Sequence, residues 1–224
     1  MRAGFGISVL LLLALSAPLA AEAPGTILVL QVSGRETPGR VPAAMPDRFT
    51  LLEDGNVYVG GTSAAATAHL EKNEIREIEK SLDRVRKIAG LGSQVTFGPG
   101  ESKQRLLVRK GRVLDITATG DPASAPQALR PLASLMMDLA AFSHPALHPY
   151  RPAFLALSAR EGELPGGCRS WTFPVPLAQA LAAPQSVSAA AAERWPTGGE
   201  PASVCAGDKR YVVTLRPLLP GEKP

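Results

Sequence analysis

The residues best suited to chemistry are two histidines in the stretch SHPALHPYRP, residues 143–152. His144 and His148 are four positions apart, a spacing that on a helix lets two imidazoles share one face and bind one metal ion. Each histidine precedes a proline, however, and a residue before proline is driven from helical toward extended conformations. In a polyproline segment the rings would lie on different faces, about 12 Å apart along the axis. We therefore interpret the stretch as a stiff connector; only a tight turn at Pro145 to Leu147 would bring the rings together.

Other candidate nucleophiles, bases and ligand platforms are scattered along the chain. The sequence contains no GxSxG, SxxK or HExxH motif, so it assigns no catalytic residue. It assigns no cofactor or metal either, because GPGES lacks the ending of a phosphate loop and the acidic turn near Asp54 lacks the further carboxylates of a calcium loop. The side chains considered and interpreted as surface, capping or packing residues are Ser63, His69, Asp138, Ser158, Glu161, Trp171 and Trp195.

The N-terminus and the two cysteines predict export. Residues 1–21 combine Arg2, an apolar run and small residues, the pattern of a signal peptide, with cleavage expected between Ala20 and Ala23. We expect a periplasmic or secreted protein with no transmembrane segment in the mature chain, because no apolar run approaches the roughly 20 residues that a span needs. In an oxidising compartment, Cys168 and Cys205 are expected to form one disulfide rather than part of a metal site.

The composition argues against nucleic-acid binding. The net charge is +4 and the isoelectric point is about 9.3, but basic residues are interleaved with acidic ones and aromatic residues make up only 5% of the chain. A mildly basic surface is compatible with contact to an anionic polymer of the cell envelope.

Residues 25–142 predict an α+β domain. GTILVLQVSG, residues 25–34, predicts a strand, and RFTLLEDGNVYVGG predicts a hairpin that turns at Asp54-Gly55-Asn56. Residues 70–89 place apolar side chains at helical spacing and end at Gly90, which predicts an amphipathic helix. A second hairpin, QRLLVRKGRVLDITATG, turns at Lys110-Gly111, and a second amphipathic helix follows Ala125 and ends near Phe142.

The stretches FTLLEDGNVYVGG and RLLVRKGRVLDI, with the helix beginning near Glu71 and the helix after Ala125, resemble a family of exported bacterial domains of unknown function. The resemblance covers about residues 47–142. It implies a four- or five-stranded antiparallel sheet with two helices packed on one face, and it carries over no catalytic residue. The stretches GGCRSWTFPVPL and YVVTLRPLLPGE also resemble segments of uncharacterised secreted bacterial proteins.

Residues 143–224 predict a proline-rich connector and a loop-rich β lobe, continuous with the first domain and held by the disulfide. AFLALSA (153–159) and RSWTF (169–173) are candidate strands, and PLAQALAAP predicts a short helix ended by Pro184. ASVCAGDKRYVVTL predicts a closing hairpin that turns at Gly207-Asp208.

Two functions of different classes follow. The first is a non-enzymatic binding or interaction module that contacts an envelope protein or an anionic envelope polymer through the open sheet face or the loops of the C-terminal lobe. The second is a hydrolase or metal-dependent enzyme whose site combines dispersed residues, namely His144, His148, Asp138 and Glu161. The second requires the two histidine rings and a carboxylate to meet in a cleft.

Overall fold

The computed structural model describes residues 25–33, 48–60, 65–196 and 200–224. The predicted signal peptide and Ser63 lie outside these residues. The described chain forms two lobes, each with its own sheet and its own apolar core. The α+β class predicted from the sequence is confirmed, with two mixed sheets that are mostly antiparallel.

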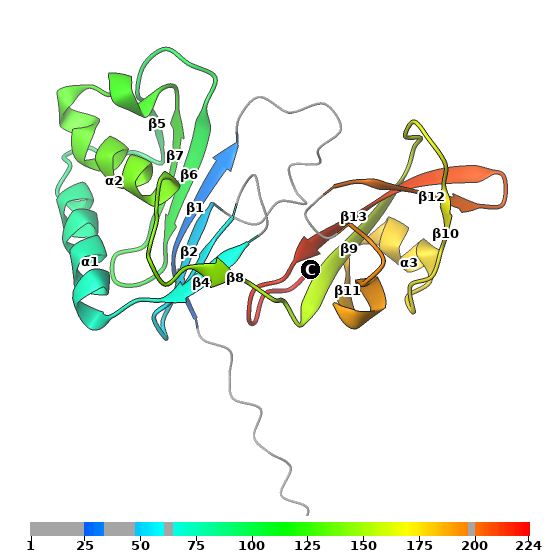
Figure 1. The fold of residues 1–224 in the computed structure, drawn as a ribbon. Helices are drawn as coiled ribbons and strands as arrows, with labels where there is room; N and C mark the ends of the chain where they lie inside the picture. Colours follow the sequence, from blue (N-terminus) through cyan, green and yellow to red (C-terminus); the bar gives the residue numbers. More distant parts are fainter. Residues whose placement is uncertain (1–24, 34–47, 61–64, 197–199) are drawn as a thin grey trace, which may run out of the picture.

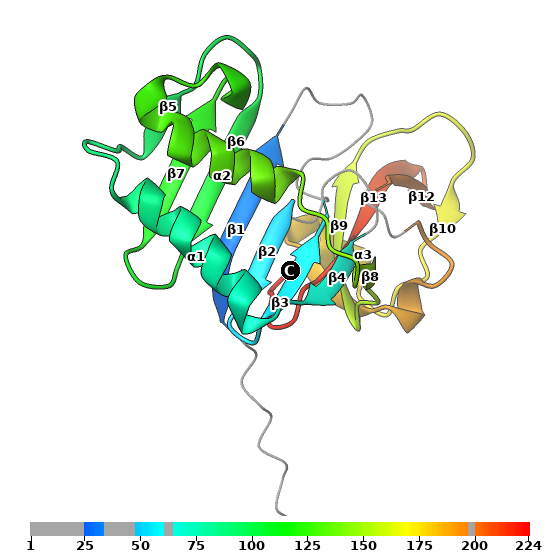
Figure 2. The ribbon, with the colours of Figure 1, turned by 60° about the vertical axis from the view of Figure 1, so that its left-hand side comes forward.

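The first lobe is built on an eight-stranded sheet with the order β5-β7-β6-β1-β2-β3-β4-β8. Helices α1 (Lys72–Arg86) and α2 (Arg130–Ala140) cover one face of this sheet (Figure 2), and the second lobe lies on the other side (Figure 1). The strands are β1 (Thr26–Ser33), β2 (Phe49–Leu52), β3 (Asn56–Val59), β4 (Ala66–His69), β5 (Gln94–Thr96), β6 (Lys103–Val108), β7 (Leu114–Thr119) and β8 (His148–Pro149).

Both predicted hairpins of the first lobe are confirmed. Strands β2 and β3 pair in antiparallel register around Gly55, which has a φ of +87° and so adopts a conformation that favours glycine. Strands β6 and β7 pair around Gly111, whose φ is +71°. Alternate residues of these strands point toward the helices, which is why the hairpins carry the period-two apolar pattern seen in the sequence.

Both predicted helices are present, with shorter bounds than the apolar pattern indicated. Helix α1 begins after a capping box in which the backbone N–H of Glu71 donates to the side chain of Glu74 at 2.7 Å. Two short 3₁₀ turns, η2 (Pro122–Ser124) and η3 (Gln127–Leu129), precede α2, because Asp121 caps the first turn and Pro126 starts the second. Pro131 lies in the first turn of α2. Backbone N–H groups in the first turn have no hydrogen-bond acceptor within the helix, so proline, which lacks this group, is tolerated there.

The first sheet is larger than the four or five strands that the resemblance implied. Strands β4, β5 and β8 are the additions, and β5 runs parallel to β7. They are two to four residues long and lack a long apolar run, so their sequences carry little strand signal. The two strands at the ends of the sheet, β5 and β8, depend on backbone pairing with β7 and β4, which are far away in the sequence.

The core of the first lobe lies between the sheet and the two helices. Leu28 and Leu30 of β1, with Leu106 of β6, are fully buried there. Leu82 and Met136 contribute from α1 and α2. Each such side chain contributes about 1.5–3 kcal/mol through removal from water, which fixes the helices on this face and leaves the opposite face of the sheet without helical cover.

The second lobe has a five-stranded sheet with the order β10-β12-β13-β9-β11. Helix α3 (Leu177–Ala182) packs on β9, and a 3₁₀ turn, η4 (Ala190–Ala192), lies beside β11. The closing hairpin and the short helix before Pro184 were predicted correctly, whereas only the first two residues of RSWTF form a strand. The strands are β9 (Phe154–Glu161), β10 (Arg169–Ser170), β11 (Gln185–Ser188), β12 (Ala202–Ala206) and β13 (Lys209–Pro217).

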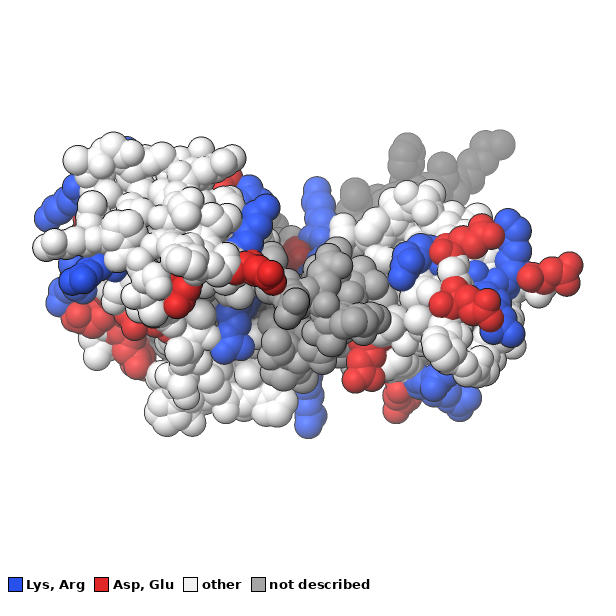
Figure 3. Space-filling view, turned by 90° about the horizontal axis from the view of Figure 1, so that it is seen from above, with Lys and Arg blue, Asp and Glu red and all other residues white. Residues whose placement is uncertain are grey.

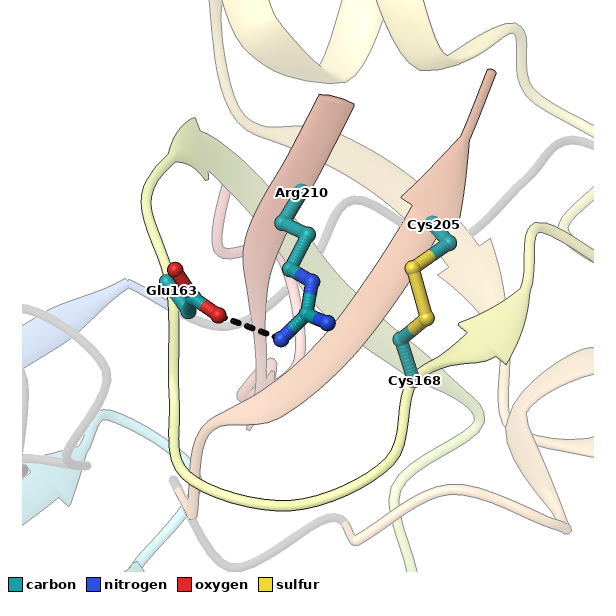
Figure 4. Close-up of a disulfide and its surroundings, with 4 residues drawn as sticks. All are labelled: Glu163, Cys168, Cys205 and Arg210. Atoms are coloured by element: carbon teal, nitrogen blue, oxygen red, sulfur yellow. Dashed lines mark hydrogen bonds and ion pairs between the residues drawn. A yellow bond between two sulfur atoms is a disulfide. The ribbon is translucent and has the colours of Figure 1, made fainter. Parts of the chain in front are cut away.

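The predicted disulfide between Cys168 and Cys205 is confirmed and joins the residue before β10 to strand β12 (Figure 4). Beside it, the ion pair of Arg210 and Glu163 joins β13 to the loop after β9, also drawn in Figure 4. The two-residue strand β10 makes only two register pairs with β12, so the covalent bond supplies order that backbone pairing alone would not. The expectation that both lobes form one continuous unit stays a prediction.

Among the described residues, no helix is long and apolar enough to cross a membrane. Acidic and basic side chains are interspersed on both lobes in the view of Figure 3, as expected for a solvated surface of mixed charge.

Candidate functional site

The connector that carries the two histidines contains a tight turn. The backbone N–H of Leu147 donates to the carbonyl of His144 at 3.1 Å, which closes a turn at residues 145–146. The connector is therefore not a continuous polyproline segment. Pro145 takes position i+1 of this turn, which its fixed φ favours, and His144 before it can stay extended, so the turn agrees with the preferences that the proline imposes. After the turn, His148 enters strand β8 and pairs with Thr67 of β4.

The two histidines have separate partners. His144 Nε2 lies 3.0 Å from Glu74 Oε1, while His148 Nδ1 lies 3.1 Å from the carbonyl oxygen of Ala146. The backbone N–H of Glu71 holds the pKa of Glu74 below its ordinary value, and His144 acts in the same direction. The His144–Glu74 contact thus attaches the connector to the first turn of α1.

The remaining dispersed candidates lie on different elements. Asp138 is exposed on α2, and Ser158 lies half-buried in β9. Glu161, at the end of β9, forms an exposed ion pair of 3.4 Å with Lys209. His69 ends β4 and contacts Asn56 across the hairpin at 3.3 Å rather than capping α1. Within the described part of the chain, no group of three or more histidine, cysteine, aspartate or glutamate side chains is placed to hold a metal ion.

The two tryptophans belong to the core of the second lobe. Phe173 lies between Trp171 and Trp195, with ring centroids 5.0 and 4.6 Å away. Each indole N–H has a partner: Trp171 donates to the carbonyl of Val175 and Trp195 to the hydroxyl of Thr172. The two indoles therefore pack within the lobe, as the neighbouring prolines indicated.

The face of the first sheet opposite the helices carries a different set of side chains. The register aligns Leu107 of β6 with Val29 of β1, Thr50 of β2 and Tyr58 of β3 in one row across this face. Residues 218–223, here called the C-terminal tail, leave β13 and cross this face. Together the face and the tail enclose a cleft of about 440 Å³, here called the open-face cleft, which falls in the size range of small-molecule sites.

The floor of the open-face cleft combines apolar and polar groups. Val29, Leu52 and Leu107 supply its apolar part. Thr50 lies among them with 3% of its surface exposed, and its Oγ1 atom is buried without a hydrogen-bond partner among the described residues. A buried hydroxyl without a partner costs about 1–3 kcal/mol, so this position is under-satisfied in the structure.

The rim of the open-face cleft is cationic. Arg109 follows β6 and Lys223 lies near the end of the tail; both are exposed and line the cleft. No hydrogen bond or ion pair joins either side chain to another described residue, although the backbone N–H of Arg109 is fixed by the carbonyl of Ile27 at 2.8 Å. The nearby Glu222 is already neutralised by Arg216 at 2.5 Å, and the carboxyl of Glu53 lies against Gly25 at one edge.

The tail is held in place by specific contacts. The hydroxyl of Tyr150 donates to the carbonyl of Leu218 at 2.9 Å, and the ring of Tyr150 packs edge-on against Tyr58 with centroids 4.9 Å apart. Glu222 also accepts from the backbone N–H of Leu219 at 3.0 Å. Burial raises the pKa of Tyr150 to about 12, with Tyr58 and Glu222 adding to the effect. Tyr150 therefore links the connector, the first sheet and the tail.

This linkage makes the stability of the protein sensitive to alkaline pH. Tyr150 retains its proton in the folded state above pH 10.0, the ordinary pKa, so its contribution is complete below that pH and is lost as the pH rises toward about 12. In Tyr150→Phe we expect a loss of about 1 kcal/mol at neutral pH and a weaker decline at alkaline pH. Urea unfolding across this pH range measures both effects, and an identical alkaline decline in the variant and the wild type would contradict the role of Tyr150.

Removing the unpartnered hydroxyl of Thr50 should raise the stability of the protein, whereas removing the hydroxyl of Tyr150 should lower it. Thr50→Val removes the unsatisfied group while retaining its shape, so we expect the free energy of unfolding to rise by about 1 kcal/mol. Thr67→Val is the matched control in the same sheet, since the Thr67 hydroxyl is hydrogen-bonded to Tyr58 and its removal should be destabilising. Thermal unfolding of the two variants tests the contrast; a lower stability for Thr50→Val would show that its hydroxyl has a partner.

Reasoning from the sequence offered the open sheet face as a candidate binding surface but did not find the open-face cleft. The available signal was the polar half of the strand alternation, with Thr50 between Phe49 and Leu51 and Arg109 directly after β6. The pattern alone does not distinguish such residues from an ordinary solvated face. The tail that closes the cleft comes from more than one hundred residues later in the chain.

The fold and the site define an α+β protein of two lobes with a cleft on the open face of its larger sheet. Comparisons with family models, with curated proteins and with solved structures found no match for this chain.

Proposed function

We propose that this protein is an exported, non-enzymatic binding module of the cell envelope and that its ligand site is the open-face cleft. The observation that carries the proposal is the combination, in one cleft of about 440 Å³, of an apolar floor, a buried hydroxyl on Thr50 and a guanidinium on Arg109, neither of which is partnered by another described residue. Concave sites that bind ligands characteristically combine apolar walls with a few polar groups that fix orientation. The cationic rim favours an anionic component of the envelope as the ligand.

Export to the periplasm or the medium is part of this proposal. It is supported by the apolar segment with small residues at the N-terminus and is compatible with the disulfide in the second lobe.

Hydrogen exchange can test the binding role against the alternative of a hydrolase or metal-dependent enzyme. The purified protein is incubated with a soluble bacterial envelope fraction, and amide exchange is followed by mass spectrometry. We expect slower exchange in β1, β2, β6 and the tail, with the composition of the fraction unchanged. Protection confined to other elements would overturn the site assignment, and chemical conversion of an envelope component that is lost in His144→Ala would support the enzyme instead.

A further inference from the structure

We propose that the open-face cleft binds a small amphipathic carboxylate, with the carboxylate at Arg109 and Lys223 and the apolar body on the sheet. This inference rests on the proposed function and narrows it to a class of ligand. It follows from how the charges, the apolar side chains and the one unsatisfied hydroxyl are distributed within the cleft.

The apolar side chains occupy the floor and the roof. Val29 and Leu107 are register partners on adjacent strands, and Leu52 lies beside them on β2. Leu219 and Pro220 of the tail face them from the other side of the cleft. A ligand body made of a few methylene groups or one ring would gain about 0.8 kcal/mol for each buried CH₂ group.

The two cations that line the cleft, unpaired among the described residues, lie at its rim. Arg109 offers a planar guanidinium whose fork matches the two oxygens of a carboxylate, and Lys223 adds a second positive charge. Among the described residues, Glu222 is paired with Arg216 and the single carboxyl of Glu53 lies against Gly25 at one edge, so the two cations leave an excess of positive charge at the rim. An inorganic anion would satisfy the rim but leave the apolar floor unused.

Thr50 supplies a polar anchor within the floor. Thr50 pairs with Val29 on the neighbouring strand, and Val29 pairs in turn with Leu107, so the three residues form one row across the sheet. The hydroxyl of Thr50 has no partner among the described residues. A second oxygen on the body of the ligand, separate from the carboxylate at the rim, would satisfy the hydroxyl, and the tail residues above it would adjust to admit the ligand. Binding would then recover part of the cost of the missing hydrogen bond.

The proposal can be tested by NMR titration of the ¹⁵N-labelled protein with four probes: hexanoate, acetate, hexylamine and inorganic phosphate. We expect hexanoate to shift the amide signals of β1, β2, β6 and the tail saturably. Acetate should bind at least about tenfold more weakly because it lacks the apolar body, and hexylamine should not bind because its charge is reversed.

Three variants locate the binding. Arg109→Gln should weaken hexanoate binding by roughly tenfold, because it removes a charge-assisted contact. Thr50→Val should leave it unchanged, because the only oxygens of hexanoate are in the carboxylate at the rim. Arg84→Gln is the matched control, since Arg84 is an exposed arginine on α1, on the other side of the sheet, and its side chain bonds only to Ser81 among the described residues.

The outcomes separate this inference from the proposed function. Equal binding of hexanoate and hexylamine, equal binding of phosphate and hexanoate, or wild-type affinity in Arg109→Gln would each overturn the carboxylate assignment. If hexanoate does not bind but the envelope fraction slows amide exchange at the cleft, the assignment of a carboxylate ligand is wrong and the proposed binding function stands. If both experiments fail at the cleft, both proposals are wrong.

Discussion

Replacing both Cys168 and Cys205 with serine should lower the free energy of unfolding of the second lobe by about 4 kcal/mol. The bond closes a loop with a sequence separation of 37, and opening it restores the conformational freedom of that loop in the unfolded chain. Few other interactions would hold β10 in place without the disulfide. This strand pairs with β12 through only two residues and lies at the edge of its sheet.

Tryptophan fluorescence is a selective probe for this experiment. The protein has two tryptophans, Trp171 and Trp195, and both lie in the second lobe. Urea unfolding followed by fluorescence therefore reports this lobe, while far-ultraviolet circular dichroism is dominated by α1 and α2 of the first lobe.

The same data test whether the lobes form one unit. Coincident transitions by the two probes would indicate joint unfolding, and separate transitions would indicate two domains. Wild-type protein treated with a reductant is the control and should match the serine variant. An unchanged fluorescence midpoint in the serine variant would contradict the assigned role of the disulfide.

Gly120→Ala should destabilise the first lobe by about 3–5 kcal/mol. Gly120 follows β7 with a φ of +92°, and a Cβ atom at this position would lie 2.0 Å from the carbonyl oxygen of Gly98. The contacting atom belongs to the backbone, so relief requires the loop at residues 97–100 to move. That movement would strain the hydrogen bonds from Phe97 to Thr119 and from Asp121 to Pro99.

Gly90→Ala provides a matched control for backbone strain alone. Gly90 has a φ of +67°, but an added Cβ atom would meet nothing within 4 Å. We expect a loss of about 1 kcal/mol in this variant, and the difference between the two variants then measures the steric contact. Thermal unfolding followed by circular dichroism supplies both values. Equal losses would show that the loop accommodates the methyl group freely.

The elements that were predicted correctly are those specified by local sequence. The hairpins at Gly55 and Gly111 combine alternating apolar residues with a turn residue, and α1 combines helical spacing with an acidic start and a basic end. The disulfide followed from the count of two cysteines and the inferred compartment. The hairpin and helix signals each lie within a short stretch of sequence, and the disulfide could be inferred without knowing the three-dimensional structure.

The parts that were not predicted depend on distant pairing. Strand β8 exists because His148 and Pro149 pair with β4, and the residues themselves would suit a loop equally well. The turn at residues 145–146 places Pro145 at a position that favours proline, but the same sequence also suits an extended connector, and the His144–Glu74 contact joins residues 70 positions apart. The open-face cleft needs Thr50, Arg109 and the tail together, and no sequence spacing links them.

The return of the tail to the first sheet places both ends of the described chain at the same opening. Gly25, directly before β1, and Lys223, near the last residue, both line the open-face cleft. A fluorescent or affinity fusion joined after Pro224 would therefore stand at the mouth of the cleft and obstruct entry. A reporter inserted in the β12–β13 turn at Gly207, where an added side chain would meet nothing within 4 Å, would leave that entrance open.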